Sequence, residues 1–155
     1  MKVLATSQVI PGTCRYCTKL PALAALPYPA IQMLQPINPL AQASALTELW
    51  SPRVVAELDD SYVKVAQVLG ELPWHAHADE DELFYVLSGR LRILMHAQTV
   101  ELGPGEAFVV PKGVLHQPQA DALCCLMLIE RKSTAHTGDT ITEHTRTLAE
   151  QLRPL

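Results

Sequence analysis

The chain has 155 residues, of which 48% are hydrophobic and 18% charged, and its net charge is −4 at pH 7. This length and apolar share suit one domain with a sizeable core and exclude most two-domain enzymes. The acidic balance, the 5% aromatic content and the lack of a basic block argue against nucleic acid as a partner. No stretch reaches the roughly 18 consecutive apolar residues of a membrane helix, so a soluble chain with no membrane partner is expected.

The N-terminal sequence predicts a cytoplasmic protein. Polar and turn-forming residues interrupt any apolar run that could form a signal peptide, namely Ser7, Gln8, Pro11 and Gly12. The four cysteines are Cys14, Cys17, Cys124 and Cys125. One pair is adjacent and a core of this size needs no crosslinks, so we expect reduced thiols. The CxxC at Cys14 and Cys17 lacks a second CxxC or paired histidines to complete a zinc site.

The composition divides the chain into parts. Six of the twelve prolines precede residue 40, and residues 1–47 carry a charge of +3 whereas residues 48–155 carry −7. We therefore predict an irregular or disordered arm at residues 1–36, a single barrel domain with a preceding helix at 37–135, and a polar tail at 136–155. Met33 offers an alternative start of translation.

A short helix is predicted at the start of the domain. Asn38 can cap it and Pro39 suits its first position, so the helix should run from about residue 40 to residue 50. Its apolar side would consist of Leu46, Leu49 and Trp50.

The rest of the domain alternates between short strand-forming runs and turns. Runs rich in β-branched and aromatic residues occur at 53–58, 62–69, 74–77, 82–88, 90–96, 98–102, 106–110, 115–119 and 123–130. A turn is expected between the last two runs, at residues 119–121, and Gly89 permits a tight turn into the run at 90–96. Many short strands at this spacing indicate an all-β antiparallel sandwich or barrel of the jelly-roll class.

The stretch 70–89, GELPWHAHADEDELFYVLSG, carries the first chemical signal. His75 and His77 are two residues apart, so in a strand both imidazoles project to the same side. Glu82 opens the next strand and brings a carboxylate beside the pair if the two strands are hairpin neighbours. The adjacent acidic turn, residues 79–81, is interpreted as solvated.

A second stretch, GEAFVVPKGVLH at residues 105–116, ends in another histidine. The two stretches resemble the two signature motifs of the cupin superfamily. The first motif is matched by His75, His77, Glu82 and Gly89, and the second by Gly105, Pro111, Gly113 and His116. The sequence departs from the pattern at Ala120, where an asparagine often stands, and at Gly70, which lies one residue closer to His75 than usual. The resemblance spans about residues 53–130, and two spaced motifs are a specific signal.

The resemblance implies a double-stranded β-helix barrel that holds one divalent metal on His75, His77, Glu82 and His116, and it implies a homodimer. Simple physics agrees with the metal, because three imidazoles and a carboxylate inside a narrow barrel are costly to desolvate without partners and a cation offsets that cost. Fe, Mn, Zn, Ni and Cu all suit this ligand set.

Alternation along the strands predicts the lining of a pocket. If Glu82 faces inward, so do Phe84 and Val86, whereas Leu83 and Tyr85 face outward. On the run at 62–69 the two faces are equally plausible, so either Lys64 or Gln67 supplies a polar group to the pocket.

The remaining histidines and the tail receive structural interpretations. His96, His136 and His144 lie outside both motifs and are expected to face solvent. The segment TAHTGD, residues 134–139, resembles the tail that follows the barrel in some small cupins and is interpreted as structural.

Three functions fit these features. The first is a metal-dependent enzyme acting on a small organic molecule, by dioxygenase-type oxidation or by isomerisation of a sugar or keto acid. The second is a non-catalytic protein that binds a small ligand through the metal. The third is a structural barrel with a dimer interface, whose apolar anchors would be Trp50, Trp74, Leu83 and Tyr85.

Overall fold

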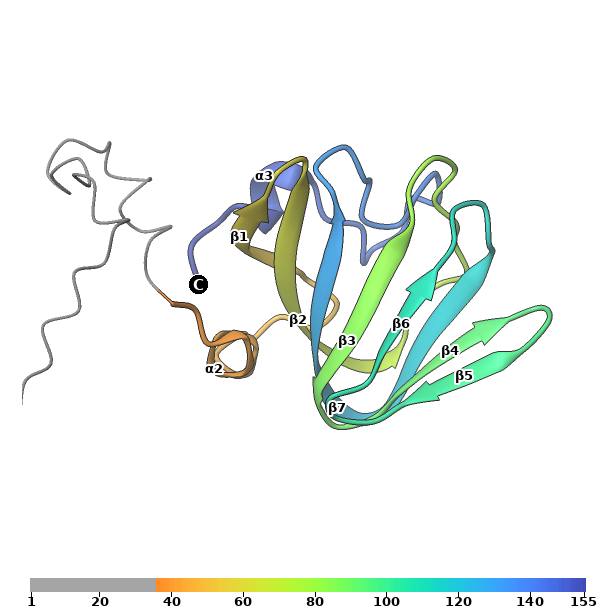
Figure 1. The fold of residues 1–155 in the computed structure, drawn as a ribbon, viewed down its shortest axis with the longest axis horizontal. Coiled ribbons are helices and arrows are strands. Elements are labelled where there is room, and N and C mark those ends of the chain that lie inside the picture. Colours follow the sequence, from red (N-terminus) through yellow and green to blue (C-terminus); the bar gives the residue numbers. More distant parts are fainter. Residues whose placement is uncertain (1–35) are drawn as a thin grey trace, which may run out of the picture. The chain divides into compact units, whose positions relative to one another are not determined.

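One long strand, β7 (His116–Arg131), is the centre of the fold (Figure 1). The computed structural model describes residues 36–155, of which 37–155 form one compact unit. β7 pairs antiparallel with β2 (Ser61–Glu71), with β3 (Glu82–Ser88) through residues 125–129, and with β4 (Leu91–Met95) through residues 116–119. The predicted arm and its two cysteines lie outside the described residues, apart from residue 36.

Three shorter strands complete the sheet. β1 (Arg53–Leu58) pairs with β2, β6 (Ala107–Val110) pairs with β3, and β5 (Thr99–Leu102) pairs with β4, each in antiparallel orientation. The strand order is β1-β2-β7-β3-β6, with β4 and β5 attached beside the first half of β7. The predicted all-β jelly-roll architecture is confirmed.

β7 replaces two predicted strands. The expected turn at residues 119–121 is a bulge instead: Cys124 pairs with Val68 and Ala120 pairs with Gly70, so three exposed residues on β7 oppose a single residue on β2. The strand bends there, and its two halves face different neighbours (Figure 1). The predicted strand at 74–77 is reduced to a single bridge between His75 and His116.

The barrel interior is apolar and continuous. Its buried members come from each of the strands β2 to β7. They include Ala66, Val68, Phe84, Val86, Leu91, Ile93, Leu102, Val110, Cys124, Leu126 and Leu128. On β3, Glu82, Phe84 and Val86 are buried while Leu83 and Tyr85 are only half-buried, as the alternation predicts. Cys124 and Cys125 are buried free thiols.

The helix α2 (Pro39–Ser44) begins as predicted and ends earlier. The Asn38 side chain accepts a hydrogen bond from the Ala41 N–H at 3.0 Å, and Pro39 takes the first helical position. The helix stops because the chain beyond it joins the sheet: Leu49 bridges to Gln67, and the Trp50 N–H donates to the Gln67 carbonyl at 2.9 Å. Trp50 is therefore not helical, and its ring is buried in the barrel rather than available as a surface anchor.

The C-terminal residues pack onto the same unit. The helix α3 (Leu148–Gln151) carries a capping box between Thr147 and Glu150 and lies against β1 (Figure 1). Thr137 and Gln151 are buried. Among residues 36–155, no helix combines the length and the apolar character that crossing a bilayer requires.

Candidate metal centre

His75 and His116 are placed by a backbone bridge. Beyond β2 the chain continues beside the start of β7, where the His75 N–H donates to the His116 carbonyl at 3.0 Å and the His116 N–H donates back at 2.9 Å. The loop of the second motif is tied to the first motif in the same way, because the Gly113 N–H donates to the His77 carbonyl at 2.7 Å. Two stretches some forty residues apart in the sequence are thus held side by side.

Backbone carbonyls fix the orientation of two imidazoles. His75 Nδ1 lies 2.8 Å from the Pro73 carbonyl oxygen, and His116 Nδ1 lies 2.9 Å from the Val114 carbonyl oxygen. A carbonyl only accepts, so each Nδ1 carries the proton and each Nε2 presents a lone pair to the interior. Metal-binding histidines are typically oriented by such contacts.

Glu82 completes the group from the first residue of β3, the strand on which it was expected, but the neighbours of this strand differ from the expectation. The sequence suggested a hairpin between the histidine pair and the strand of Glu82, but β3 pairs with β6 and β7, and Glu82 lies opposite Val110. Its Oε2 atom is 3.2 Å from His77 Nε2 and 3.2 Å from His116 Nε2. The predicted hairpin does not form, but Glu82 lies beside the histidine pair as predicted.

The four side chains converge on one point. One ligand atom from each of His75, His77, Glu82 and His116 lies within 4.8 Å of the others, and all four residues are buried. His75 Nε2, His77 Nε2, His116 Nε2 and Glu82 Oε2 have no hydrogen-bond partner among residues 36–155. Buried polar atoms without partners are costly. A divalent cation would satisfy all four at once, so this donor set fits a metal ion.

The electrostatics of the group also suit a cation. Burial lowers the pKa of His75 to about 4, which keeps this imidazole neutral at pH 7. For His77, burial opposes protonation, but contact with the Glu82 carboxylate prevails and raises its pKa. Burial alone would raise the pKa of Glu82, yet the contacts with His116 and His77 hold it well below its usual range. The group therefore places an ionised carboxylate beside a neutral His75 imidazole, and these are the forms in which the two side chains bind a metal ion.

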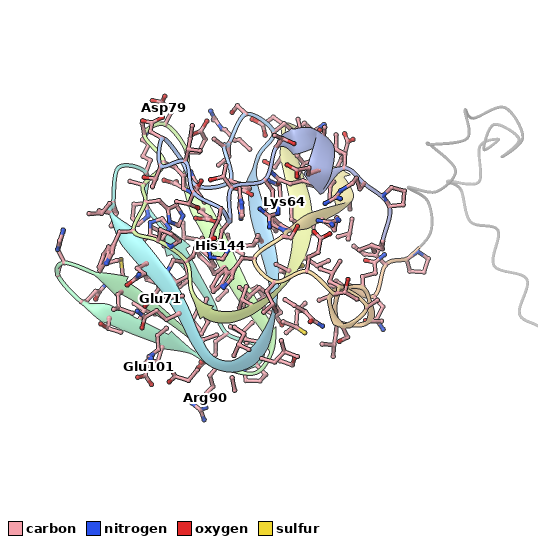
Figure 2. The ribbon with its side chains drawn as sticks, turned by 180° about the vertical axis from the view of Figure 1, so that it is seen from behind. Lys64, Glu71, Asp79, Arg90, Glu101 and His144 are labelled. Carbon is pink, nitrogen blue, oxygen red and sulfur yellow. The ribbon has the colours of Figure 1, made fainter. Side chains whose placement is uncertain are left out.

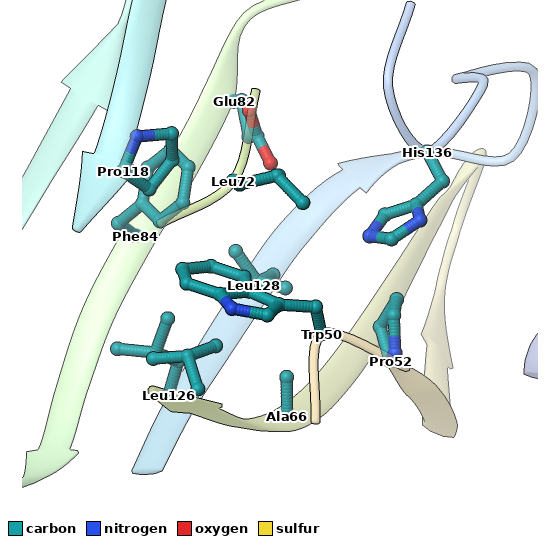
Figure 3. Close-up of a pocket in the computed structure, with 11 residues that line it drawn as sticks. Trp50, Pro52, Ala66, Leu72, Glu82, Phe84, Pro118, Leu126, Leu128 and His136 are labelled. Atoms are coloured by element: carbon teal, nitrogen blue, oxygen red, sulfur yellow. The ribbon is translucent and has the colours of Figure 1, made fainter. Parts of the chain in front are cut away.

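A small apolar cavity adjoins the group at Glu82 (Figure 3). Its volume is about 20 Å³, on a scale where one water molecule needs about 10–15 Å³. Most of its wall is apolar: Trp50, Pro52, Ala66, Val68, Leu72, Phe84, Pro118, Leu126 and Leu128. Among the described residues that line it, Glu82 and His136 are the two with titratable side chains.

The predicted pocket residues take different places. Phe84 lines the cavity, and Val86 is buried in the core on the same face of β3. Lys64 shares the inward face of β2 with Ala66 and Val68, so of the two alternatives it is Lys64 that points into the barrel. Gln67 lies on the opposite face and is half-buried.

Lys64 forms a buried ion pair beside the group. Its Nζ atom is 2.5 Å from Glu130 Oε1, and both side chains are almost fully buried (Figure 2 shows Lys64 among the strands). Burial, reinforced by the nearby Glu82 carboxylate, raises the pKa of Glu130 to about 7. The acidic turn is more exposed: Asp81 Oδ1 accepts from the Lys112 N–H at 2.9 Å, and Glu80 accepts from Ser133 Oγ at 2.9 Å.

His136 was predicted to face solvent, but it is half-buried and its side chain points inward. Its ring lines the cavity together with Glu82, and burial lowers its pKa to about 4. No periodic pattern marks it; the one available signal is its place between threonines in the segment at 134–139. His96 is exposed, as expected, and stacks on Trp74, whereas His144 is half-buried beside Glu143.

We expect acidification to destabilise the wild-type chain more than a His136→Gln variant. Between pH 6.5 and about 4, the unfolded chain binds a proton that the folded imidazole excludes, so stability present above pH 6.5 is lost as the pH falls. The free energy of unfolding of the wild type, relative to the variant, should drop by about 2 kcal/mol from pH 8 to pH 5. Urea unfolding of chelator-treated protein at both pH values measures this difference. An equal loss in the two chains would contradict it.

Residues 63–129 match the model of the Cupin domain family. The chain is 33% identical over 96 residues to the uncharacterized protein YdbB of Bacillus subtilis (strain 168), covering 61% of this chain and 85% of that protein. It is also similar to the crystal structure of a cupin-2 domain containing protein from Shewanella frigidimarina, with 45% identity, a TM-score of 0.60, and coverage of 62% of this chain and 94% of the other.

A second solved structure, protein NMB1881 from Neisseria meningitidis, matches with 27% identity and a TM-score of 0.58, over 63% of this chain and all of the other. Together with the fold and the two motifs, these matches make the chain a member of the cupin superfamily.

Proposed function

We propose that the protein is a metal-dependent enzyme that acts on a small organic molecule at a His₃Glu centre. The observation that carries this proposal is the set of four buried ligand atoms, which lack partners among residues 36–155 and adjoin an apolar cavity. A purely structural ion would not require a cavity beside one of its ligands. An apolar cavity of about 20 Å³ next to a metal centre has room for a reactant of a few atoms.

His75, His77, Glu82 and His116 would hold one divalent ion, and Fe, Mn, Zn, Ni and Cu suit this donor set. When bound, such an ion supplies Lewis-acid chemistry or, if it is a redox metal, the means to use O₂. The protein's own residues orient the imidazoles through the Pro73 and Val114 carbonyls and exclude bulk water with an apolar wall.

The cavity wall favours oxidation over sugar isomerisation. A sugar or sugar phosphate needs several polar partners. The described wall provides two polar side chains, Glu82 and His136, and nine apolar ones. We therefore propose a dioxygenase-type oxidation of a compact, largely apolar molecule. Isomerisation of a keto acid is the second reaction to test.

A non-catalytic metal-dependent binding protein is the alternative. The small apolar cavity supports it, because binding a ligand needs fewer proton-transferring groups than catalysis does.

Two further features belong to the proposal. The buried free thiols Cys124 and Cys125 support a reducing, cytoplasmic location. Half-buried Leu83 and Tyr85 and 45%-exposed Val109 support a homodimer through the outer face of β3 and β6.

Protein purified without chelator is expected to contain about one equivalent of one metal per chain, measured by elemental mass spectrometry. A His77→Ala plus His116→Ala variant should contain none, because two of the four ligands are removed. The matched control is His96→Ala, which removes an exposed histidine and should keep the metal. Equal metal in all three proteins would overturn the proposal, and ligand binding without O₂ consumption or turnover would favour the binding protein.

A further inference from the structure

The C-terminal segment approaches the histidine pair unusually closely. Gly138 has φ +53°, and a Cβ atom there would lie 1.9 Å from the carbonyl oxygen of Ala76, the residue between His75 and His77. Only glycine permits this approach. The segment that follows β7 is therefore packed directly on the backbone that carries two of the proposed ligands.

Two residues before Gly138, the chain directs an imidazole into the cavity. The Arg146 N–H donates to His136 Nδ1 at 3.2 Å, and the Arg146 carbonyl accepts from Gln151 Nε2 at 2.9 Å. Thr137, which is buried, donates to the Thr140 carbonyl at 2.6 Å. His136 is thus held by its own segment rather than placed loosely at the surface.

The bond from Arg146 determines the form of the His136 ring. A backbone N–H can only donate, so Nδ1 is the acceptor and the proton of the neutral imidazole resides on Nε2. A ring nitrogen faces the interior of the cavity, across from the Glu82 carboxylate (Figure 3). His136 therefore presents a neutral N–H donor to the cavity. Glu82 presents a carboxylate oxygen, which would be a ligand of the proposed metal.

We propose that His136 is a ligand-binding residue of this cavity, whose Nε2–H donates a hydrogen bond to an oxygen atom of a small molecule bound at the metal centre. This inference rests on the proposed function. The remaining wall is apolar and the space is about 20 Å³, so the ligand class is a molecule of few atoms, with a carboxylate or carbonyl oxygen between the metal and His136. The burial that lowers the pKa of His136 to about 4 keeps the ring a neutral donor at pH 7.

The test uses formate as the probe and Co²⁺-loaded full-length protein, with the dissociation constant read from the visible absorption of the metal. His136→Leu should keep one Co²⁺ per chain and weaken formate binding about tenfold or more, the effect of one lost hydrogen bond to a charged group. His136→Gln, which keeps an N–H donor near the same position, should stay within about threefold of the wild type. His96→Leu is the control and should bind formate normally.

The tautomer is tested separately by long-range ¹H–¹⁵N NMR of the Zn²⁺-loaded protein, which should show His136 protonated at Nε2 and perturbed on adding formate. Equal formate affinity in wild type and His136→Leu, a His136→Gln variant as weak as His136→Leu, or a proton on Nδ1 would each overturn the assignment of His136 while leaving the metal centre intact. A wild-type chain that binds neither Co²⁺ nor Zn²⁺ would overturn the proposed function together with this inference.

Discussion

Replacing Lys64 with methionine is expected to destabilise the protein by about 3–5 kcal/mol at pH 8, because it leaves the buried Glu130 carboxylate without its cation. Glu130 Oε2 lacks a hydrogen-bond partner among residues 36–155, so within this part of the chain the carboxylate depends on the Lys64 ammonium group at Oε1. Lys64 lowers the pKa of Glu130, which is about 7 in the wild type, so the carboxyl of the variant should titrate at a higher pH and the loss of stability should be smaller at pH 6 than at pH 8. Urea unfolding at pH 6 and pH 8 measures both effects.

Two control variants make this prediction specific. Lys132→Met removes another lysine paired with a glutamate, Glu57, but that pair is solvent-accessible and the change should cost much less stability than Lys64→Met. Adding Glu130→Leu to Lys64→Met removes the uncompensated charge and should recover most of the stability. A Lys64→Met variant as stable as Lys132→Met would show that the buried pair is not needed in the fold.

Replacing Gly138 with alanine is expected to cost about 3 kcal/mol or more in stability. The methyl group would overlap the Ala76 carbonyl, which is rigid backbone, and φ of +53° adds the strain of a left-handed conformation. Since Ala76 separates His75 and His77, the variant should also bind metal more weakly. Thermal unfolding and metal content measured on the same sample test both consequences.

Gly105→Ala is the matched control for backbone strain. Gly105 has φ +85°, and a Cβ atom there would meet nothing within 4 Å among the described residues. This variant should lose only about 1–2 kcal/mol and should keep its metal. If the two alanine variants behave alike, the close approach of the C-terminal segment does not restrain the histidine pair.

The proposed ligands could be predicted from the sequence because their signals are local. His75 and His77 share a face through simple alternation, and the spacing of glycine, proline and histidine up to His116 marks the second motif. The hairpin expected to carry Glu82 was wrong because sequence proximity suggested a pairing that β6 and β7 take instead. The same alternation left Lys64 and Gln67 undecided, since both faces of β2 carry mostly apolar residues.

His136 and Trp50 could not be placed from sequence. Trp50 continues a helical pattern in the sequence. In the structure its backbone instead pairs with Gln67 of β2, and this pairing replaces the last turns of the predicted helix. His136 reaches the cavity because nearby Gly138 packs on Ala76, about sixty residues earlier, and because the Arg146 N–H, ten residues later, donates to its ring. Such long-range packing leaves no periodic trace in the chain.

The bent β7 strand also affects how the protein acquires its site during folding. Its partners begin with Ser61, which pairs with Arg131 seventy residues later, so the central pairing closes a long loop before it gains its hydrogen bonds. His116 stands at the first residue of this strand, and it joins His75 only when the strand is in place. A nascent or refolding chain thus lacks the full set of four ligands until these long-range contacts form, so capture of an ion at this site would mark a barrel whose central strand is in place.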